Sequence, residues 1–358
     1  MSKKFHNFDP LLLVPVAILA VLSLTTLYSI NFSYFRSQLI FLIISIVFFV
    51  LISFANYRVL KMYALPIYIA SLIFLFLVLI LGIETRGSIR WIELYGFRIQ
   101  FSEILKPFLA ISLSSFLMTR KNNLRHFISV FLLLAPILVL IFLQPDLGNT
   151  LIYLFVTVLT MIFFGFSYRY FASIILPVFI FIPLLWNFLH QYQKQRLFSF
   201  LNPTADPLGS SYNAIQSLIT VGSGMFLGKG LGQGTQSSLS FLPEQHTDFI
   251  FATISEQLGF LGNLLILVCF AVILLRIYSI FKNSNDDFCG VFSAVAFFII
   301  LVQFFLNIGM NIGIIPIVGV TLPFVSYGGS SLLSSFILLG FLSAVSSSEK
   351  ESVTLQIR

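Results

Sequence analysis

The chain has 358 residues, of which 58% are hydrophobic, 16% aromatic and 9% charged. Soluble domains are about half apolar and about a quarter charged, so this composition excludes a water-soluble globule and a disordered chain. The net charge of +7 would suggest nucleic acid in a soluble protein, but the basic patches are short and scattered, and we expect no nucleic-acid partner. An α-helical protein with several membrane spans remains.

A spanning helix needs about 20 mostly apolar residues, and the sequence predicts ten of them. In chain order they cover residues 10–30, 38–55, 62–82, 104–119, 127–143, 149–166, 171–189, 249–275, 288–312 and 329–347. The last two come from one uncharged stretch, 288–348, which as a single helix would be about 90 Å long. Pro316, Pro323 and the pair Gly328-Gly329 therefore predict a turn inside it.

The distribution of Lys and Arg predicts the orientation of these spans. With the N-terminus inside, twelve of the 20 cations fall on the inner side, as the positive-inside bias requires. We therefore predict an all-α polytopic membrane protein, one domain over residues 1–358, with ten transmembrane helices and with the N- and C-termini cytoplasmic.

Two outer loops are long: residues 83–103, and residues 190–248 between the seventh and eighth helices. Within the second, residues 210–225 alternate polar with apolar side chains and predict a short amphipathic or re-entrant segment. The glycine-rich run 222–234 has the wrong spacing for a phosphate-binding loop, which favours flexible turns around Lys229. The inner loops are too short for a catalytic domain, so we expect chemistry outside or within the membrane.

The thirteen acids are few enough to be examined one by one. Eight fall on the outer side or in outer halves of spans: Glu84, Glu93, Glu103, Asp146, Asp206, Glu244, Asp248 and Glu256. An acid near hydrocarbon is costly and is a functional candidate by default.

For three of these acids a structural role competes with a functional one. Glu103 and Lys106 share a helix face, which predicts either a mutually neutralised pair or the polar lining of a cavity. Asp146, at the end of the fifth span, resembles a helix-terminus cap. Glu256 could line a cavity or pair with a cation.

Asp248 is the strongest single candidate. It follows His246 and Thr247 and directly precedes the apolar run of the eighth span, so it is expected at the water boundary. Its side chain could be an N-cap, or it could be a general base at the mouth of a cavity. The sequence leaves both interpretations open.

Outer cations are the natural partners of a developing negative charge. The candidates are Arg90, Lys194, Arg196 and Lys229. Trp91, next to Arg90, is typical of an interfacial anchor rather than a substrate platform.

Several motifs occur in one order along the chain. They include Arg90-Trp91-Ile92, Phe101-Ser102-Glu103-Ile104-Leu105-Lys106-Pro107, Gln144-Pro145-Asp146-Leu147-Gly148, Leu242-Pro243-Glu244-Gln245-His246-Thr247-Asp248-Phe249, Asn307-Ile308-Gly309-Met310 and Leu322-Pro323-Phe324-Val325-Ser326-Tyr327-Gly328-Gly329. Together these motifs resemble the SEDS family (shape, elongation, division and sporulation) of bacterial wall synthases. The short N-terminal tail resembles the rod-elongation branch more than the division branch. Gln257 departs from the family pattern, since many relatives have an acid there.

The resemblance implies a glycosyltransferase of the bacterial cytoplasmic (inner) membrane that polymerises lipid II into β-1,4 glycan strands during elongation, with Asp248 as catalytic base. It also implies a divalent cation, Mg²⁺ or Mn²⁺, whose ligands stay unknown. The implied partners are a class B penicillin-binding protein (a transpeptidase), lipid II, membrane lipid and other elongation-complex proteins. A lipid II flippase and a non-catalytic scaffold remain as alternatives, and an O-antigen ligase or polymerase lacks the residues around His246 and Asp248.

Overall fold

A computed structural model describes residues 8–85, 88–94, 97–118, 122–173, 186–187, 191–239 and 241–356. Seven helices in this part of the chain are long and apolar enough to cross a membrane: α1 (Pro10–Ile30), α2 (Phe32–Ser53), α4 (Ala64–Leu81), α7 (Leu124–Leu143), α13 (Ile250–Lys282), α14 (Asp287–Asn311) and α15 (Gly329–Gln356). Two shorter apolar helices, α6 (Lys106–Leu117) and α8 (Leu147–Phe163), occupy two further predicted spans.

The predicted spans agree with these helices in place and differ in length. The first coincides with α1, which Asp9 caps and Pro10 begins, as expected for a proline at the first helical position. The predicted span 104–119 is shorter in the structure because the chain breaks at Leu105 between α5 (Phe101–Ile104) and α6. Most of the predicted span 171–189 lies outside the described residues.

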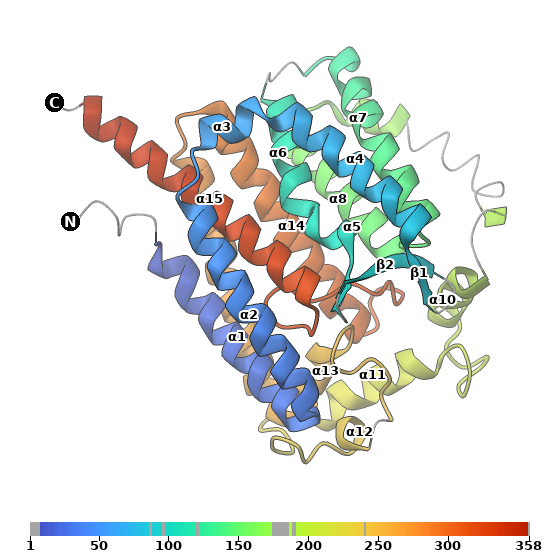
Figure 1. The fold of residues 1–358 in the computed structure, drawn as a ribbon. Coiled ribbons are helices and arrows are strands. Elements are labelled where there is room, and N and C mark those ends of the chain that lie inside the picture. The colour runs from blue at the N-terminus through green and yellow to red at the C-terminus, as the bar shows by residue number, and fades with distance from the viewer. Residues whose placement is uncertain are drawn as a thin grey trace.

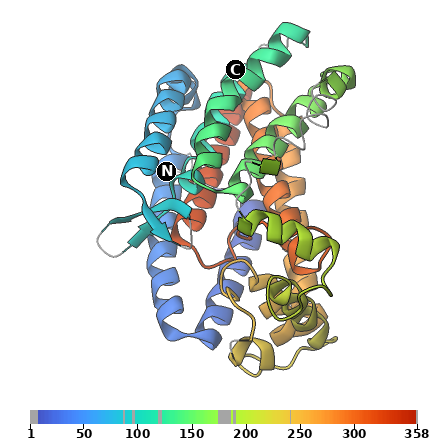
Figure 2. The same cartoon turned by 90° about the vertical axis from the view of Figure 1, so that its right-hand side faces the viewer.

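Connecting elements gather at the two ends of the bundle (Figures 1 and 2). The short helix α3 (Tyr57–Met62) lies at the upper end in Figure 1. The strands and the helices α10 (Gln191–Leu201), α11 (Tyr212–Ser223) and α12 (Thr235–Ser238) lie towards the other end. The helix α11 confirms the predicted short segment at residues 210–225. The two long outer loops of the prediction therefore lie on the same side.

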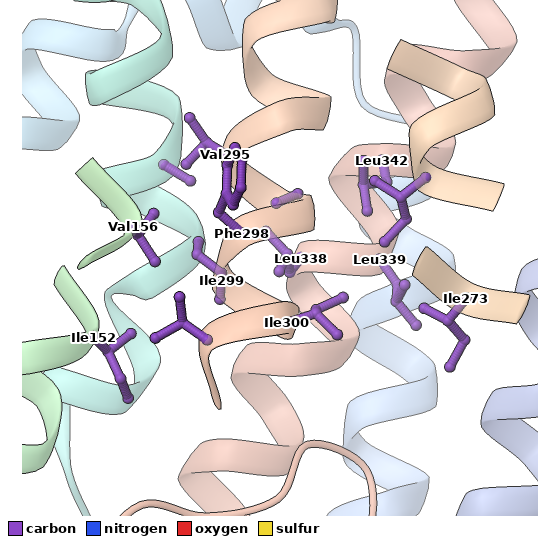
Figure 3. Close-up of a cluster of buried hydrophobic side chains, with 14 of the residues drawn as sticks. Ile152, Val156, Ile273, Val295, Phe298, Ile299, Ile300, Leu338, Leu339 and Leu342 are labelled. Atoms are coloured by element: carbon purple, nitrogen blue, oxygen red, sulfur yellow. The ribbon is translucent and has the colours of Figure 1, made fainter. Parts of the chain in front are cut away.

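The core is built around α14 and α15. Their most apolar windows are 78% and 83% buried, against 17% for α2, so these two helices are enclosed by protein. Figure 3 shows the centre of this packing, where Ile300 of α14 lies towards Leu338 and Leu339 of α15, and Ile299 lies towards Ile152 and Val156 of α8. Because lipid is as apolar as these side chains, close packing holds such helices together.

A small antiparallel sheet in the first outer loop was missed by the sequence analysis. It consists of β1 (Ile83–Thr85), β2 (Ser88–Leu94) and β3 (Phe97–Ile99), in that order. Successive side chains of a strand point to opposite faces. The pairing shifts by one residue at Arg90, which lies between Ile89 opposite Glu84 and Trp91 opposite Ile83, and such a bulge interrupts the regular alternation of side chains.

Helix α13 is interrupted near its outer end. Gly259 has φ 63° and ψ −156°, which ends the α-helical conformation there, and glycine adopts this backbone at little steric cost. The break leaves main-chain groups without helical partners. The amides of Lys229 and Gly230 donate to the carbonyls of Glu256 and Gln257, while Phe260 N–H donates to the carbonyl of Met225.

The predicted turns around Lys229 are present, at residues 224–227 and 231–232, and they are held by these hydrogen bonds. The glycine-rich run lies directly against α13, so closely that a β-carbon on Gly224 would be 1.7 Å from the carbonyl oxygen of Ser255. Small residues are needed where two backbones approach this closely.

Candidate active site at the start of helix α13

Asp248 ends a tight turn that leads into α13. The carbonyl of Glu244 accepts hydrogen bonds from the amides of Thr247 and Phe249, and Glu244 itself has φ 52°. A positive φ is costly for a residue with a side chain and is common at functional sites. The partly buried Asp248 follows at the boundary between this turn and the helix.

The interpretation of Asp248 as the N-cap of α13 is wrong. Phe249 occupies the N-cap position, and its side chain cannot accept a hydrogen bond. The amide of Ala252, in the first helical turn, instead donates to Oδ1 of Asn311 on α14 at 3.1 Å. A neighbouring helix thus supplies the acceptor that an N-cap side chain normally provides.

The main chain of Asp248 is held by two buried asparagines one helical turn apart on α14. Nδ2 of Asn307 donates to the Asp248 carbonyl at 3.0 Å, and Nδ2 of Asn311 donates to the same oxygen at 2.9 Å. Asn307 also donates to the carbonyl of Val320 at 2.7 Å. These contacts fix residue 248 relative to the segment 317–320 that follows α14.

Arg196 of α10 approaches Asp248 over the glycine of that segment. A β-carbon on Gly319 would lie 3.4 Å from Oδ2 of Asp248 and 3.6 Å from Nη1 of Arg196. Nη1 of Arg196 also donates to the carbonyl of Ile317 at 3.3 Å. Burial lowers the pKa of Arg196 and the charge of Asp248 opposes this shift, but a guanidinium stays protonated in proteins.

Arg90 adds a second cation on the far side of Arg196. Its charge is close enough to lower the pKa of Arg196, after the larger effect of burial, and its Nη1 lies 4.0 Å from Oδ1 of Asp146. Gly148, two residues after Asp146, lies against the carbonyls of Val318 and Gly319. The structure therefore brings Arg90, Arg196 and Asp146 around the segment next to Asp248.

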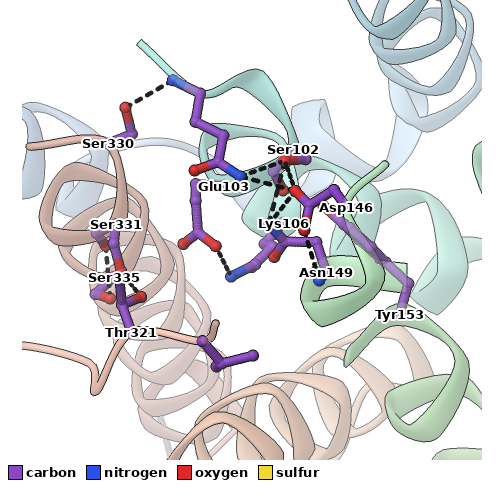
Figure 4. A network of polar contacts seen from close by, with 12 residues as sticks. Ser102, Glu103, Lys106, Asp146, Asn149, Tyr153, Thr321, Ser330, Ser331 and Ser335 are labelled. Atoms are coloured by element: carbon purple, nitrogen blue, oxygen red, sulfur yellow. Dashed lines mark hydrogen bonds and ion pairs between the residues drawn. The ribbon is translucent and has the colours of Figure 1, made fainter. Parts of the chain in front are cut away.

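Asp146 is the N-cap of α8, which confirms its predicted structural role. Oδ1 accepts from the amide of Asn149 at 3.1 Å, and Oδ2 accepts from Gln100, Ser102 and the Asn149 side chain at 2.7 to 2.9 Å (Figure 4). A carboxylate with this many donors is occupied in holding α5 and α8 together.

Glu103 and Lys106 form the predicted neutralised pair. Nζ of Lys106 donates to Oε1 of Glu103 at 2.7 Å, and both residues are buried (Figure 4). Oε2 of Glu103 is buried without a hydrogen-bond partner in the described part of the chain. The pair lies beside the Asp146 network and beneath Ser330, which accepts from the amide of Gln100 at 3.0 Å.

Glu256 pairs with a cation, as one of its two interpretations expected. Lys229 Nζ donates to its Oε1 at 2.9 Å, and the amides of Gln236 and Ser237 at the start of α12 donate to the same carboxylate at 3.0 and 2.9 Å. Glu256 has no exposed surface. Lys229 and Glu256 thus fasten the second outer loop to α13 and are committed to each other.

The other predicted residues lie around the turn or away from it. His246 stacks on Tyr34 with ring centroids 4.2 Å apart and lies next to Tyr327, so it packs the turn against α2. Lys194 lies over the ring of Trp186 and, two positions from Arg196 on α10, faces away from it. Trp91 follows Arg90 on β2 and is partly buried; its role as an anchor stays a prediction.

The described residues contain no cluster of three or more His, Cys, Asp or Glu side chains that could hold a metal ion. Mg²⁺ is often bound through one or two carboxylates together with substrate phosphates. The expected divalent cation therefore has no protein-only site in these residues.

Three residues of the site were not singled out for a role: Asn307, Asn311 and Gly319. Asn307 and Asn311 are four positions apart in an otherwise apolar stretch, which puts two costly amides on one helix face. That spacing was the available signal. Gly319 carries no such signal, because its importance depends on which side chains fold over it.

This chain, with Asp248 and Arg196 on either side of Gly319 and Arg90 near Arg196, resembles known proteins along most of its length. The family model described as cell cycle protein, covering FtsW, RodA and SpoVE, matches residues 8–351. The chain is 40% identical over 283 residues to the peptidoglycan glycosyltransferase MrdB of Escherichia coli, covering 77% of this chain and 75% of MrdB. It is 32% identical over 368 residues to a probable peptidoglycan glycosyltransferase FtsW of Geobacter metallireducens, covering 97% of both.

Solved structures agree with these sequence relatives. A chain from a peptidoglycan synthase complex, described as coordinating polymerization and crosslinking, has a TM-score of 0.83 and 29% identity, with 96% of this chain and 98% of that chain covered. The rod shape determining protein RodA of Thermus thermophilus has a TM-score of 0.72 and 25% identity, with 96% and 97% covered. The chain belongs to the SEDS family of FtsW, RodA and SpoVE proteins.

Proposed function

We propose that this chain is a peptidoglycan glycosyltransferase of the bacterial inner membrane that polymerises lipid II, with Asp248 as general base. The observation that carries the assignment is the arrangement at Gly319, where the carboxylate of Asp248 and the guanidinium of Arg196 border one point. The names of the relatives supply the reaction class.

The chemistry matches these two groups. The hydroxyl of an acceptor sugar attacks the anomeric carbon of a donor held on pyrophosphate, the new glycosidic bond forms, and the bond to pyrophosphate breaks. The hydroxyl proton passes to Asp248, and the electrons of the broken bond leave with the pyrophosphate. Since the donor is α-linked and the product β-1,4-linked, a single displacement with inversion is sufficient.

Arg196 and Arg90 are the proposed partners of the leaving group. Positive charge held in place before reaction stabilises the negative charge that develops on pyrophosphate. The Nε atom of Arg90 is buried and has no hydrogen-bond partner within the described residues, so it retains a donor for a phosphate oxygen. Lys229 and Lys194 are not proposed for this role, because Lys229 pairs with Glu256 and Lys194 lies over Trp186, whereas Arg196 lies beside Asp248.

The finer topology remains part of the proposal. We infer ten spans, with the seventh inside residues 171–189, and with the chain ends and α3 on the cytoplasmic side. The clustering of α10, α11, α12 and the small sheet at one end supports this orientation. It gives Asp248 access to an outer headgroup, while the lipid tail of the substrate stays in the membrane.

The partner is proposed to be a class B penicillin-binding transpeptidase. The related chain comes from a complex that joins polymerization to crosslinking, and crosslinking is the reaction of a transpeptidase. The cation is proposed to be Mg²⁺ or Mn²⁺, bound chiefly through substrate phosphates, and no step above depends on it. A role in elongation rests on the similarity to MrdB and RodA.

The direct test is polymerisation of lipid II by the purified chain, with and without its cognate transpeptidase, beside the variant Asp248→Asn. Polymer from the parent and none from a well-folded variant would support both the activity and its base. Polymer from both would remove Asp248 from the centre of the reaction. Polymer from neither, with partner and divalent cation present, would favour the flippase or the scaffold.

A further inference from the structure

Asn307 and Asn311 both donate a hydrogen bond to the carbonyl oxygen of Asp248 but differ in their other partners. Asn311 Oδ1 accepts from Ala252, and its carbonyl accepts from the hydroxyl of Ser217 at 2.9 Å, so it joins α11 and α13 to α14. Asn307 instead joins Asp248 to Val320. One residue stabilises the helices, and the other connects the two segments that border the proposed reaction site.

Segment 317–320, which ends at Val320, lies beside both Asp248 and Arg196. Its residue Gly319 separates Asp248 from Arg196, and the carbonyl of Ile317 accepts from the Arg196 guanidinium. The position of Arg196 relative to Asp248 therefore depends on how segment 317–320 lies against residue 248. The two hydrogen bonds of the Asn307 amide nitrogen join residue 248 to this segment.

We propose that Asn307 is a positioning residue of glycosyl transfer: it holds the main chain of Asp248 against Val320 and so sets the carboxylate beside the Arg196 guanidinium. This inference rests on the proposed function of Asp248. Asn307 is completely buried. Both hydrogen bonds that its amide nitrogen donates go to main-chain carbonyls, and its Oδ1 faces Nδ2 of Asn311 at 3.5 Å, so it acts through Asp248 and Arg196 rather than on the substrate. A displacement of about 1 Å at reacting groups can lower a rate about 100-fold.

The test compares Asn307→Leu, which keeps similar volume but removes the donor, with Gln303→Leu. Gln303 is also buried and lies one turn earlier on α14, so the control makes the same polar-to-apolar change in the same helix. For each variant the turnover number and the KM for lipid II are measured, together with thermal unfolding in detergent. Asn307→Ser, a smaller change that keeps a hydroxyl donor, provides a second variant if Asn307→Leu does not fold.

We expect Asn307→Leu to lower kcat by about 10- to 100-fold with KM within about twofold of the parent, because substrate binding is left intact. Asn307→Ser should fall between this variant and the parent, and Gln303→Leu should keep parental kcat. Parental kcat in folded Asn307 variants, or a loss that follows unfolding equally in both Leu variants, would overturn the inference.

A double variant separates positioning from an independent role. In the Arg196→Ala background, which is expected to keep measurable activity, the further change Asn307→Leu should cost little more, since residues that act as one unit are not additive. An equal additional loss would show that Asn307 acts separately from the pairing of Arg196 with Asp248. An inactive parent would instead count against the proposed function itself.

Discussion

Nζ of Lys229 lies 2.9 Å from Oε1 of Glu256, a carboxylate without exposed surface on the outer part of α13. The lysine comes from the glycine-rich run and the glutamate from a helix that begins about twenty residues later. Their ion pair is therefore the side-chain counterpart of the main-chain hydrogen bonds between the same two segments.

Removing this lysine should destabilise the protein without removing a reacting group. We expect Lys229→Met to lower the free energy of unfolding by about 1.5–3 kcal/mol, the usual contribution of a hydrogen bond to a charged group. The double variant Lys229→Met with Glu256→Gln should recover most of the loss, because no unpaired charge is then buried. Thermal unfolding in detergent measures both, and a stable but inactive Lys229→Met would assign the lysine to catalysis instead.

The pair of Glu103 and Lys106 should behave in the same way, more strongly, since both members are buried. Lys106→Met or Glu103→Gln alone is expected to cost about 3–5 kcal/mol, and the double variant less than either. Unfolding and lipid II polymerisation are measured on all three variants. Equal loss of activity in all three, at parental stability, would point to an individual chemical role.

Gly319 offers a test of the geometry around Asp248. Gly319→Ala places a methyl group between the carboxylate and the guanidinium, and we expect at least a tenfold loss of kcat, about 1.4 kcal/mol in the barrier. Gly232→Ala is the matched control, because Gly232 has φ 73° against 72° for Gly319 but lies beside Ser29. Both changes introduce similar backbone strain. If Gly232→Ala impairs activity equally, strain rather than position is responsible.

Two cations of α10 should differ in their effect on catalysis. Arg196→Ala is expected to lower kcat by about 100-fold, typical of losing one charge-stabilising donor, whereas Lys194→Ala should change it less than about threefold because that ammonium lies over Trp186. Steady-state polymerisation rates decide between them. A larger effect at Lys194 would show that the leaving group is bound on the other face of α10.

Removal of divalent cations is expected to reduce polymerisation and to leave the fold intact. A cation bound chiefly by substrate phosphates contributes to binding of the leaving group and little to the stability of the free protein. EDTA titration followed by addition of Mg²⁺ or Mn²⁺ measures the activity, with thermal unfolding in parallel. Full activity in EDTA would contradict the cation requirement that the family resemblance implies.

The helices were predictable because a membrane span leaves a strong signal in local hydropathy. The prediction of α1 agrees at both ends, and α14 agrees within one residue at each end. The strands at residues 83–99 were not predictable from the sequence, because short amphipathic strands give a weak hydropathy signal beside long apolar runs. The break at Gly259 also gives no signal in the local sequence, because main-chain groups about thirty residues earlier stabilise it.

The candidate site was predictable in composition but not in arrangement. The scarcity of acids singled out Asp248, and its position before an apolar run gave the N-cap alternative that the structure excludes. Which of four cations approach it depends on tertiary structure: Arg90 and Arg196 converge, while Lys194 and Lys229 have other partners. Hydropathy carries no information about such pairing.

The break at Gly259 restricts how members of this family can exchange parts. The segment from Gly224 to Gly230 completes the hydrogen bonding of a transmembrane helix with its own backbone, so its fit depends on chain path more than on side-chain identity. A chimera that takes the second outer loop from one relative and the helix from another would combine two backbones shaped for other partners. Grafts that transfer residues 191–282 together should fold, and grafts that end between the loop and the helix should not.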